Sequence, residues 1–186
     1  MKIGSIKSKE VLSHIINIIN IQLGDSYVSM EEMNQFFDQK NVLIHVAEIE
    51  QQIVAFSISQ IMDENSIAEL LDSKPNFNPS FFKKDLRYAY RFLTAVHPDH
   101  ERKGIGQALI DYGINELKDK VDYIFCDAWK SKDGTHIHYN LIKAGYQKQE
   151  EIGNYWLQES QQKGYTCAVC KGDCYCSAVL YVVDLN

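Results

Sequence analysis

The chain has 186 residues, of which 45% are hydrophobic and 24% are charged, and its net charge is −6 at pH 7. This length is enough for one hydrophobic core and short for two, so we expect one domain over residues 1–186. The acidic balance argues against nucleic acid as a main partner, because binding to phosphates requires a basic face.

Residue spacing divides the first 80 residues into six predicted elements. Apolar residues recur at helical spacing in some segments and follow a strand pattern in others. In chain order we expect a strand, two helices, two strands and a loop that contains one helical turn: 1–6, 9–23, 29–38, 41–48, 52–62 and 63–80, with the turn at 67–71. The second helix has a clear start signal, because Ser29 and Glu32 have the spacing of a capping box.

Strands and helices alternate in the remainder of the chain. We expect the strands 87–96, 121–129, 146–158 and 177–184 and the helices 104–118 and 135–144. Pro98 ends the first of these strands, because proline has no N–H donor for the ladder. A strand-rich start followed by alternating elements is typical of a three-layer α/β or α+β domain.

The N-terminal region carries no export signal. The apolar run 15–21 is interrupted by Asn17 and Asn20 and is too short to span a bilayer, and no later segment reaches that length. We therefore expect a cytoplasmic protein with no membrane partner. The sequence is compatible with a homodimer.

The most informative segment is the run 96–109, Val-His-Pro-Asp-His-Glu-Arg-Lys-Gly-Ile-Gly-Gln-Ala-Leu. A strand ends there, a short basic loop with two glycines follows, and an amphipathic helix begins. The first helical turn has N–H groups without partners in the helix, and the helix dipole favours an anion beside them. Gly104 and Gly106 would let a pyrophosphate reach this backbone, and Arg102 and Lys103 add positive charge.

Other glycine-loop motifs fit this segment less well. A Walker-type loop is excluded because no Gly-Lys-Ser/Thr follows, and a dinucleotide fingerprint would need a third glycine where Leu109 stands. A Gly-x-Gly pair can also be a simple tight turn. Here the strand, the proline, the basic pair and the amphipathic helix occur in the order that an anion site requires, which favours binding.

The run resembles the acyl-CoA-binding motif of the GNAT superfamily of N-acetyltransferases. That motif is usually written Gln/Arg-x-x-Gly-x-Gly/Ala, after a strand that ends in Val-x-Pro. Glu101 departs from its first position, where a neutral or basic residue is usual. The element order over residues 3–185 is similar to that of the family as well. The resemblance implies a mixed α/β three-layer fold, with a splayed central mixed sheet flanked by helices and CoA in the gap between two strands.

The resemblance also implies an activity and a donor site. The acetyl group of acetyl-CoA would pass to a primary amine of a small molecule or peptide. The backbone of Ala95 and Val96 would pair with the pantetheine arm. The loop that would hold the pyrophosphate consists of Arg102, Lys103, Gly104, Ile105, Gly106 and Gln107.

The proton donor is the point where the match ends. In many relatives a tyrosine four residues before a Gly-Phe pair protonates the leaving thiolate. Gly145-Tyr146 matches that pair, but position 141 is a leucine. Tyr139 is our candidate acid, and its alternative role is to pack its ring on the sheet. The other candidates are His136 and His138, and no residue is identified as the general base.

Four of the five cysteines lie within residues 167–176. In a chain without an export signal, such a cluster indicates a metal site more than disulfides. We expect a structural zinc site in the loop 165–177, clipping the last two strands together, although an iron–sulfur cluster needs similar thiols and the thiols could also point apart. The expected ligands are Cys167, Cys170, Cys174 and Cys176. Cys126 lies alone in an apolar run and is expected to be buried.

Two other kinds of function remain open. A different acyltransferase would use a longer acyl-CoA or an alcohol acceptor. An acyl-CoA-binding or zinc-stabilised interaction module would keep the fold without turnover, and the leucine at position 141 is the best argument for it. The sequence carries no readable code for the acceptor.

Overall fold

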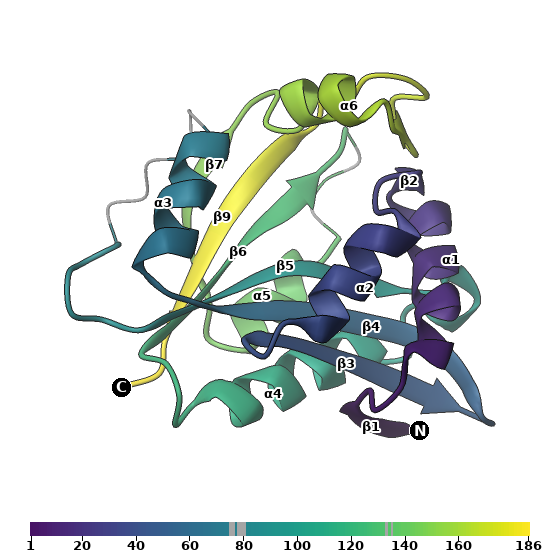
Figure 1. Ribbon diagram of the computed structural model, residues 1–186, viewed down its shortest axis with the longest axis horizontal. Helices are drawn as coiled ribbons and strands as arrows, with labels where there is room; N and C mark the ends of the chain where they lie inside the picture. The colour runs from purple at the N-terminus through teal and green to yellow at the C-terminus, as the bar shows by residue number, and fades with distance from the viewer. Residues whose placement is uncertain (75–76, 78–80, 133, 135) are drawn as a thin grey trace.

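A seven-stranded mixed sheet forms the centre of the computed structural model, which describes residues 1–74, 77, 81–132, 134 and 136–186 (Figure 1). The strand order is β1-β3-β4-β5-β6-β9-β7, and every neighbouring pair is antiparallel except β5 and β6. The strands are β1 (Lys2–Ser5), β3 (Val42–Ile49), β4 (Gln52–Met62), β5 (Tyr88–Val96), β6 (Tyr123–Lys130), β7 (Gln147–Ile152) and β9 (Ser177–Asp184).

Helices cover both faces of this sheet, because successive side chains of a strand point to opposite faces. Phe56 packs in a cluster with the first helix, whereas its neighbour Ala55 packs with Leu109 on the other face. One face carries α1 (Leu12–Gln22), α2 (Met30–Asp38), α3 (Glu64–Ser73) and α6 (Leu157–Lys163), and the other carries α4 (Ile105–Leu117) and α5 (His138–Lys143) (Figure 1). This arrangement confirms the predicted three-layer mixed α/β fold.

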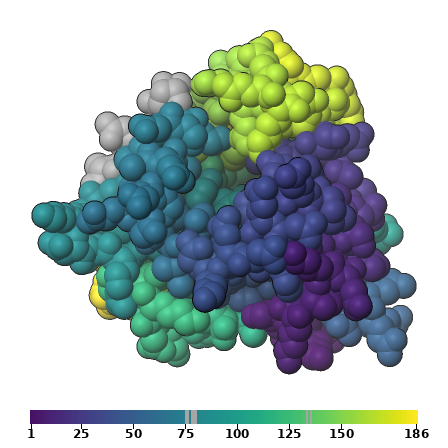
Figure 2. Space-filling model, viewed as in Figure 1, coloured from purple at the N-terminus to yellow at the C-terminus, as the bar shows by residue number. Residues whose placement is uncertain are grey.

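A second, two-stranded sheet joins distant parts of the chain. β2 (Gly24–Asp25) pairs antiparallel with β8 (Thr166–Cys167). The segment after α1 therefore lies against the loop that carries the clustered cysteines, residues 165–177, which we call the cysteine loop. Gly24 has φ 135°, and a Cβ at this position would lie 2.0 Å from the Thr166 carbonyl oxygen. Only glycine allows this close approach. Figure 2 shows the resulting contact between the N-terminal and C-terminal parts on one face of the molecule.

Several predicted elements are confirmed and two are wrong. The capping box of Ser29 and Glu32 is present at the start of α2. The segment 63–80 was expected to be mainly loop, but α3 spans ten residues of it, because Asp63 and Ser66 form a capping box. The strand expected over 146–158 ends at Ile152, and α6 follows.

The physical reason for α6 is local. Its residues, Leu-Gln-Glu-Ser-Gln-Gln-Lys, are mostly good helix formers, and Gly164 ends the helix in the left-handed conformation with φ 68°. The helix expected over 135–144 is α5, which begins at His138, and residue 135 lies outside the described residues. Pro75 and Pro79 of the expected loop lie outside them as well. Among the described residues, no helix combines the length and apolarity needed to cross a bilayer.

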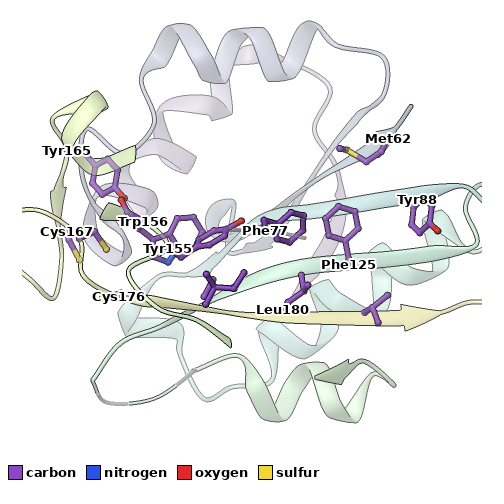
Figure 3. Packing of buried hydrophobic residues seen from close by; sticks show 14 residues of the cluster. Met62, Phe77, Tyr88, Phe125, Tyr155, Trp156, Tyr165, Cys167, Cys176 and Leu180 are labelled. Atoms are coloured by element: carbon purple, nitrogen blue, oxygen red, sulfur yellow. The ribbon is translucent and has the colours of Figure 1, made fainter. Parts of the chain in front are cut away.

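An aromatic row fills the core between the sheet and the α3–α6 side. Trp156, Tyr155, Phe77 and Phe125 follow one another from the cysteine loop along the sheet (Figure 3). Their ring centroids are 4.6 Å apart for Tyr155 and Trp156 and 6.2 Å apart for Phe77 and Phe125. Trp156, at one end of this row, lines the cavity described below.

Candidate functional site

The two parallel strands at the centre of the sheet separate after a short pairing. β5 and β6 pair only over Tyr88–Tyr90 and Tyr123–Phe125. The register between β4 and β5 shifts after Ser59↔Arg91 to Ile58↔Leu93, so Phe92 is the extra residue of a β-bulge. A bulge bends a strand and increases its twist, which turns the end of β5 away from β6. The predicted splay of the sheet is therefore present.

The gap opens into a cavity of about 800 Å³. Its walls come from β5, β6, the end of α1, the start of α4 and the cysteine loop. Large ligand sites in open sheets form where neighbouring strands diverge, because their backbone groups are then free to face a ligand. Residues expected from the sequence line this cavity: Ala95, Val96, Arg102, Gly104, Ile105 and Gly106.

The loop that precedes α4 forms an anion-binding geometry. After the 3-10 turn η2 (Pro98–His100), Arg102 and Gly104 both have positive φ, 56° and 81°. Gly104 is the N-cap of α4, and no side chain caps the first turn. The N–H groups of this turn are therefore free to bind an anion, which the helix dipole also favours. Lys103 donates from Nζ to the Asp99 carbonyl oxygen at 2.7 Å.

The end of α1 reaches across to this loop. Gln22 donates from Nε2 to the Val96 carbonyl oxygen, and to Glu101 Oε1 at 2.6 Å. Glu101 is the residue that departs from the family motif. In the structure its carboxylate accepts a hydrogen bond from a side chain at the end of α1. The sequence offered no signal for this contact, because Gln22 and Glu101 are 79 residues apart.

A buried carboxylate lies on β6, in the wall opposite β5. Asp127 is 7% exposed, and its Oδ2 accepts a hydrogen bond from the Tyr90 hydroxyl at 2.7 Å. Burial raises the pKa of Asp127 to about 6, although the charge of Lys74 and the Tyr90 hydrogen bond oppose this shift. A carboxyl group with such a pKa is suited to accept a proton near neutral pH. Asp127 was not among the site residues expected from the sequence, although it is the single charged residue in the run Ile-Phe-Cys-Asp-Ala-Trp.

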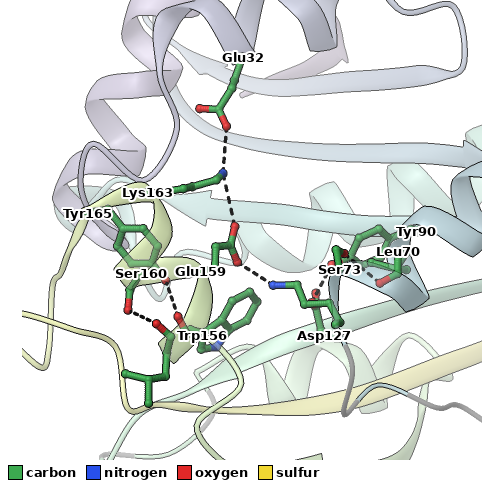
Figure 4. Close-up of polar contacts among 12 residues, drawn as sticks. Glu32, Leu70, Ser73, Tyr90, Asp127, Trp156, Glu159, Ser160, Lys163 and Tyr165 are labelled. Carbon is green, nitrogen blue, oxygen red and sulfur yellow. Dashed lines mark hydrogen bonds and ion pairs between the residues drawn. The ribbon is translucent and has the colours of Figure 1, made fainter.

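A chain of ion pairs connects the three helices α2, α3 and α6, which cover the same face of the sheet (Figure 4). Lys74 Nζ lies 2.7 Å from Glu159 Oε2. Lys163 Nζ lies 3.4 Å from Glu159 Oε1 and 2.9 Å from Glu32 Oε1. Glu32 lies in the first turn of α2, Lys74 directly follows α3, and Glu159 and Lys163 lie in α6. The Lys74 ammonium also lies over the rings of Tyr155 and Trp156, at 4.7 and 4.8 Å from their centroids.

The four clustered cysteines converge on one point. Their Sγ atoms all lie within 4.8 Å of one another, and those of Cys170 and Cys176 are 3.7 Å apart. Zinc–sulfur bonds of about 2.3 Å in a tetrahedron would separate sulfurs by about 3.8 Å. The Cys170 N–H also points to Cys167 Sγ at 3.4 Å. The four thiols therefore point together rather than apart, and this donor set fits a tetrahedral ion such as zinc.

One neighbour of the cysteine loop differs from our expectation. β9 begins at Ser177, as expected, so Cys174 and Cys176 precede it, but the strand on the other side of the loop is the short β8 and not the strand expected over 146–158, which ends at Ile152. Cys167 and Cys174 also line the cavity. The cysteine loop is far in sequence from the glycine loop (residues 102–107) but borders the same cavity.

Comparison with known proteins agrees with this geometry. Residues 15–146 match the family model described as the acetyltransferase (GNAT) family, which is more than half of the chain. The chain belongs to the GNAT acetyltransferase family. No curated protein matches it.

Solved structures share this GNAT fold at low sequence identity. smu.2055 from Streptococcus mutans UA159 is 18% identical, with a TM-score of 0.69 and full coverage of both chains. The ribosomal-protein-S18-alanine N-acetyltransferase from Escherichia coli is 18% identical, with a TM-score of 0.68 over 100% of this chain and 94% of that one. The GNAT-like decarboxylase GphF in complex with isobutyryl-CoA is 11% identical, with a TM-score of 0.68 and full coverage of both. These likenesses concern the fold.

The proton-donor candidates of this GNAT chain lie in different surroundings. Tyr139 is 82% exposed and is not part of the cavity wall. His138 shares a 2.6 Å hydrogen bond between its Nδ1 and the Tyr181 hydroxyl. His136 and Asn140 do line the cavity. The role of Tyr139 as acid remains a prediction, and His136 is the better placed of the named candidates.

Two further residues of the cavity wall have clear surroundings. Cys126 is buried, as expected, and burial raises its thiol pKa to about 12. Arg91 is buried and donates to Ser57 Oγ and to the Ile110 carbonyl oxygen, at 3.1 and 3.3 Å. Gly113 of α4 leaves room for its guanidinium, because a Cβ there would lie 2.7 Å from Arg91 Nη2.

Proposed function

We propose that this GNAT protein is an N-acetyltransferase that transfers the acetyl group of acetyl-CoA to a primary amine. The observation that carries the proposal is the uncapped start of α4, which opens on the same cavity as the buried Asp127 carboxylate. An acyl-CoA needs an anion site for its pyrophosphate and a cleft that leads from there to the reacting group. The pyrophosphate would bind at residues 102–107, and the pantetheine arm along Ala95 and Val96.

The residues of the chain have distinct roles in this reaction. The amine nitrogen forms a bond to the acetyl carbon while the carbon–sulfur bond breaks, so one proton leaves the amine and one is needed by the thiolate. Asp127 is the base in this proposal, because its pKa of about 6 keeps it ionised at neutral pH and ready to take a proton. His136 is the proposed proton donor to the thiolate, because it is an imidazole that lines the cavity.

We also propose that the cysteine loop holds one structural zinc ion and that residues 1–186 fold as one domain. Four protein thiolates leave no open position for a water, so such a site would act on stability and not on chemistry. The convergence of the sulfurs supports this role.

The test is release of the CoA thiol from acetyl-CoA across a panel of primary amines, together with calorimetric binding of acetyl-CoA. We expect acetyl-CoA to bind and thiol release to depend on the amine. Binding without amine-dependent release would favour the interaction module. Preference for a longer acyl-CoA or for an alcohol would favour the other acyltransferase class.

A further inference from the structure

The part of the cavity beside Asp127 has an aromatic wall that the donor site does not use. The rings of Tyr27, Trp156 and Tyr165 line it, and Val169 adds an aliphatic surface. Tyr27 and Tyr165 meet edge to face, with centroids 4.9 Å apart. An aromatic wall of this kind binds apolar groups by removing their surface from water.

The carboxylate beside this wall has one oxygen with incomplete partners. Asp127 Oδ2 accepts from Tyr90, and the Tyr155 hydroxyl lies close enough to lower the carboxyl pKa, but among the described residues the buried Oδ1 has no partner at full hydrogen-bond geometry. A buried, ionised oxygen is stabilised most by a cationic donor. The neighbouring rings already show that this region takes an ammonium, because Lys74 lies over Tyr155 and Trp156. Lys74 itself is paired with Glu159 at 2.7 Å.

The cysteine loop holds this aromatic wall in position. Tyr165 precedes Cys167 by two residues, and Val169 lies between Cys167 and Cys170. The pairing of β8 with β2 brings Tyr27 beside Tyr165, and the Ala168 N–H donates to the Leu23 carbonyl oxygen at 3.2 Å. The Cys174 N–H donates to the buried Ser160 hydroxyl at 2.9 Å, which fixes the loop to α6.

We propose that the acceptor is a primary amine carried on an aromatic or other apolar group, and that the cysteine loop supplies part of the wall that recognises this group, through Tyr165 and Val169. Asp127 would hold the ammonium, and Tyr27, Trp156 and Tyr165 would pack against the apolar part. This inference rests on the proposed N-acetyltransferase function and specifies its substrate class. It separates the acceptor side of the cavity, formed by Tyr27, Trp156 and the cysteine loop, from the donor side, formed by the start of α4.

The experiment compares 2-phenylethylamine with ethanolamine and spermidine as acceptors. We expect kcat/KM to be at least about tenfold higher for 2-phenylethylamine, because binding against the aromatic wall removes the surface of its ring from water. Tyr165→Ala should raise the KM for 2-phenylethylamine about tenfold and leave acetyl-CoA affinity unchanged. Tyr165→Phe, which keeps the ring, should restore the KM. Tyr175→Ala is the matched control, since Tyr175 lies in the same loop and is 60% exposed.

A second arm removes the metal with a chelator. We expect the KM for 2-phenylethylamine to rise while calorimetric binding of acetyl-CoA is preserved. An equal or higher kcat/KM for ethanolamine or spermidine would overturn the substrate class, and so would turnover of either amine without turnover of 2-phenylethylamine. The wild-type panel decides this even where Tyr165→Ala fails to fold. Protein that does not bind acetyl-CoA, or that binds it and turns over none of the three amines, would instead contradict the proposed function.

Discussion

None of the described residues requires a glycine at position 106. Its φ is not in the left-handed region, and a Cβ added there would lie 3.7 Å from Val96 Cγ2, an ordinary contact. Glycine in a helix is less stable than alanine by up to about 1 kcal/mol. A residue that weakens its own helix without a structural need is consistent with the close approach of a ligand to the backbone.

Gly106→Ala is therefore expected to have opposite effects on stability and on binding. The melting temperature should rise by up to a few degrees, whereas acetyl-CoA affinity should fall, and Gly106→Val should lower that affinity more than tenfold. Calorimetry measures both quantities on the same samples. A folded Gly106→Val protein with unchanged affinity would show that the pyrophosphate binds elsewhere.

Asp127 gives a prediction on pH dependence. Its pKa of about 6 in the folded protein means that kcat/KM should fall about tenfold per pH unit below pH 6, where the base is protonated. Asp127→Asn should remove this acid limb and reduce kcat/KM by about 10²- to 10⁴-fold. A pH profile that keeps the same limb in Asp127→Asn would assign the proton transfer to another group.

The same shift has a consequence for stability, which needs no substrate. The folded pKa of Asp127 lies above the value of about 4 for an unfolded aspartate, so the folded state binds the proton more tightly. Its contribution to the unfolding free energy therefore declines as pH rises from about 4 to about 6. Asp127→Asn should gain stability relative to wild type over this window, as measured by denaturant unfolding.

At the scale of elements, the cysteine loop should behave as a metal-dependent unit. Protein purified without added metal or chelator should contain one equivalent of zinc by elemental analysis. The double variant Cys170→Ser/Cys174→Ser should lose it together with several degrees of melting temperature, because metal binding contributes to folding stability. Cys126→Ala is the control for metal content, since Cys126 lies outside the cluster.

Two results would change this assignment. Metal-free native protein with four titratable thiols in the loop would end it, and iron with visible absorbance would indicate a cluster instead. Cys167 and Cys174 border the cavity, so loss of the metal should change the acceptor side through direct contact. The long separation in sequence between the cysteine loop and residues 102–107 does not prevent this.

At the scale of the whole molecule, the ends of the chain are tied into shared sheets. β1 and β9 belong to the same seven-stranded sheet, and β2 pairs with β8. We expect one cooperative unfolding transition, with far-ultraviolet circular dichroism and tryptophan fluorescence giving the same midpoint in denaturant. Both tryptophans, Trp129 and Trp156, lie in the C-terminal half, so separate transitions would be visible and would contradict a single domain.

The sequence by itself determined the features that depend on neighbours along the chain. The start of α2 at Ser29, the end of β5 before Pro98 and the glycine loop before α4 follow from caps, donors and backbone conformations that act over a few residues. The resemblance to the GNAT family rests on such local features as well. Helix α3 could also have been predicted from its capping box, had Pro75 and Pro79 not favoured a loop.

Only the tertiary structure decided which distant residues share the cavity. Asp127 becomes a candidate base because β6 is buried and diverges from β5, and burial raises its pKa, which no local pattern records. Glu101 meets Gln22, and the cysteine loop meets β2, through contacts between residues more than 70 positions apart. Side-chain electrostatics depend on burial and on neighbours in space, and the packing of the whole sheet sets both.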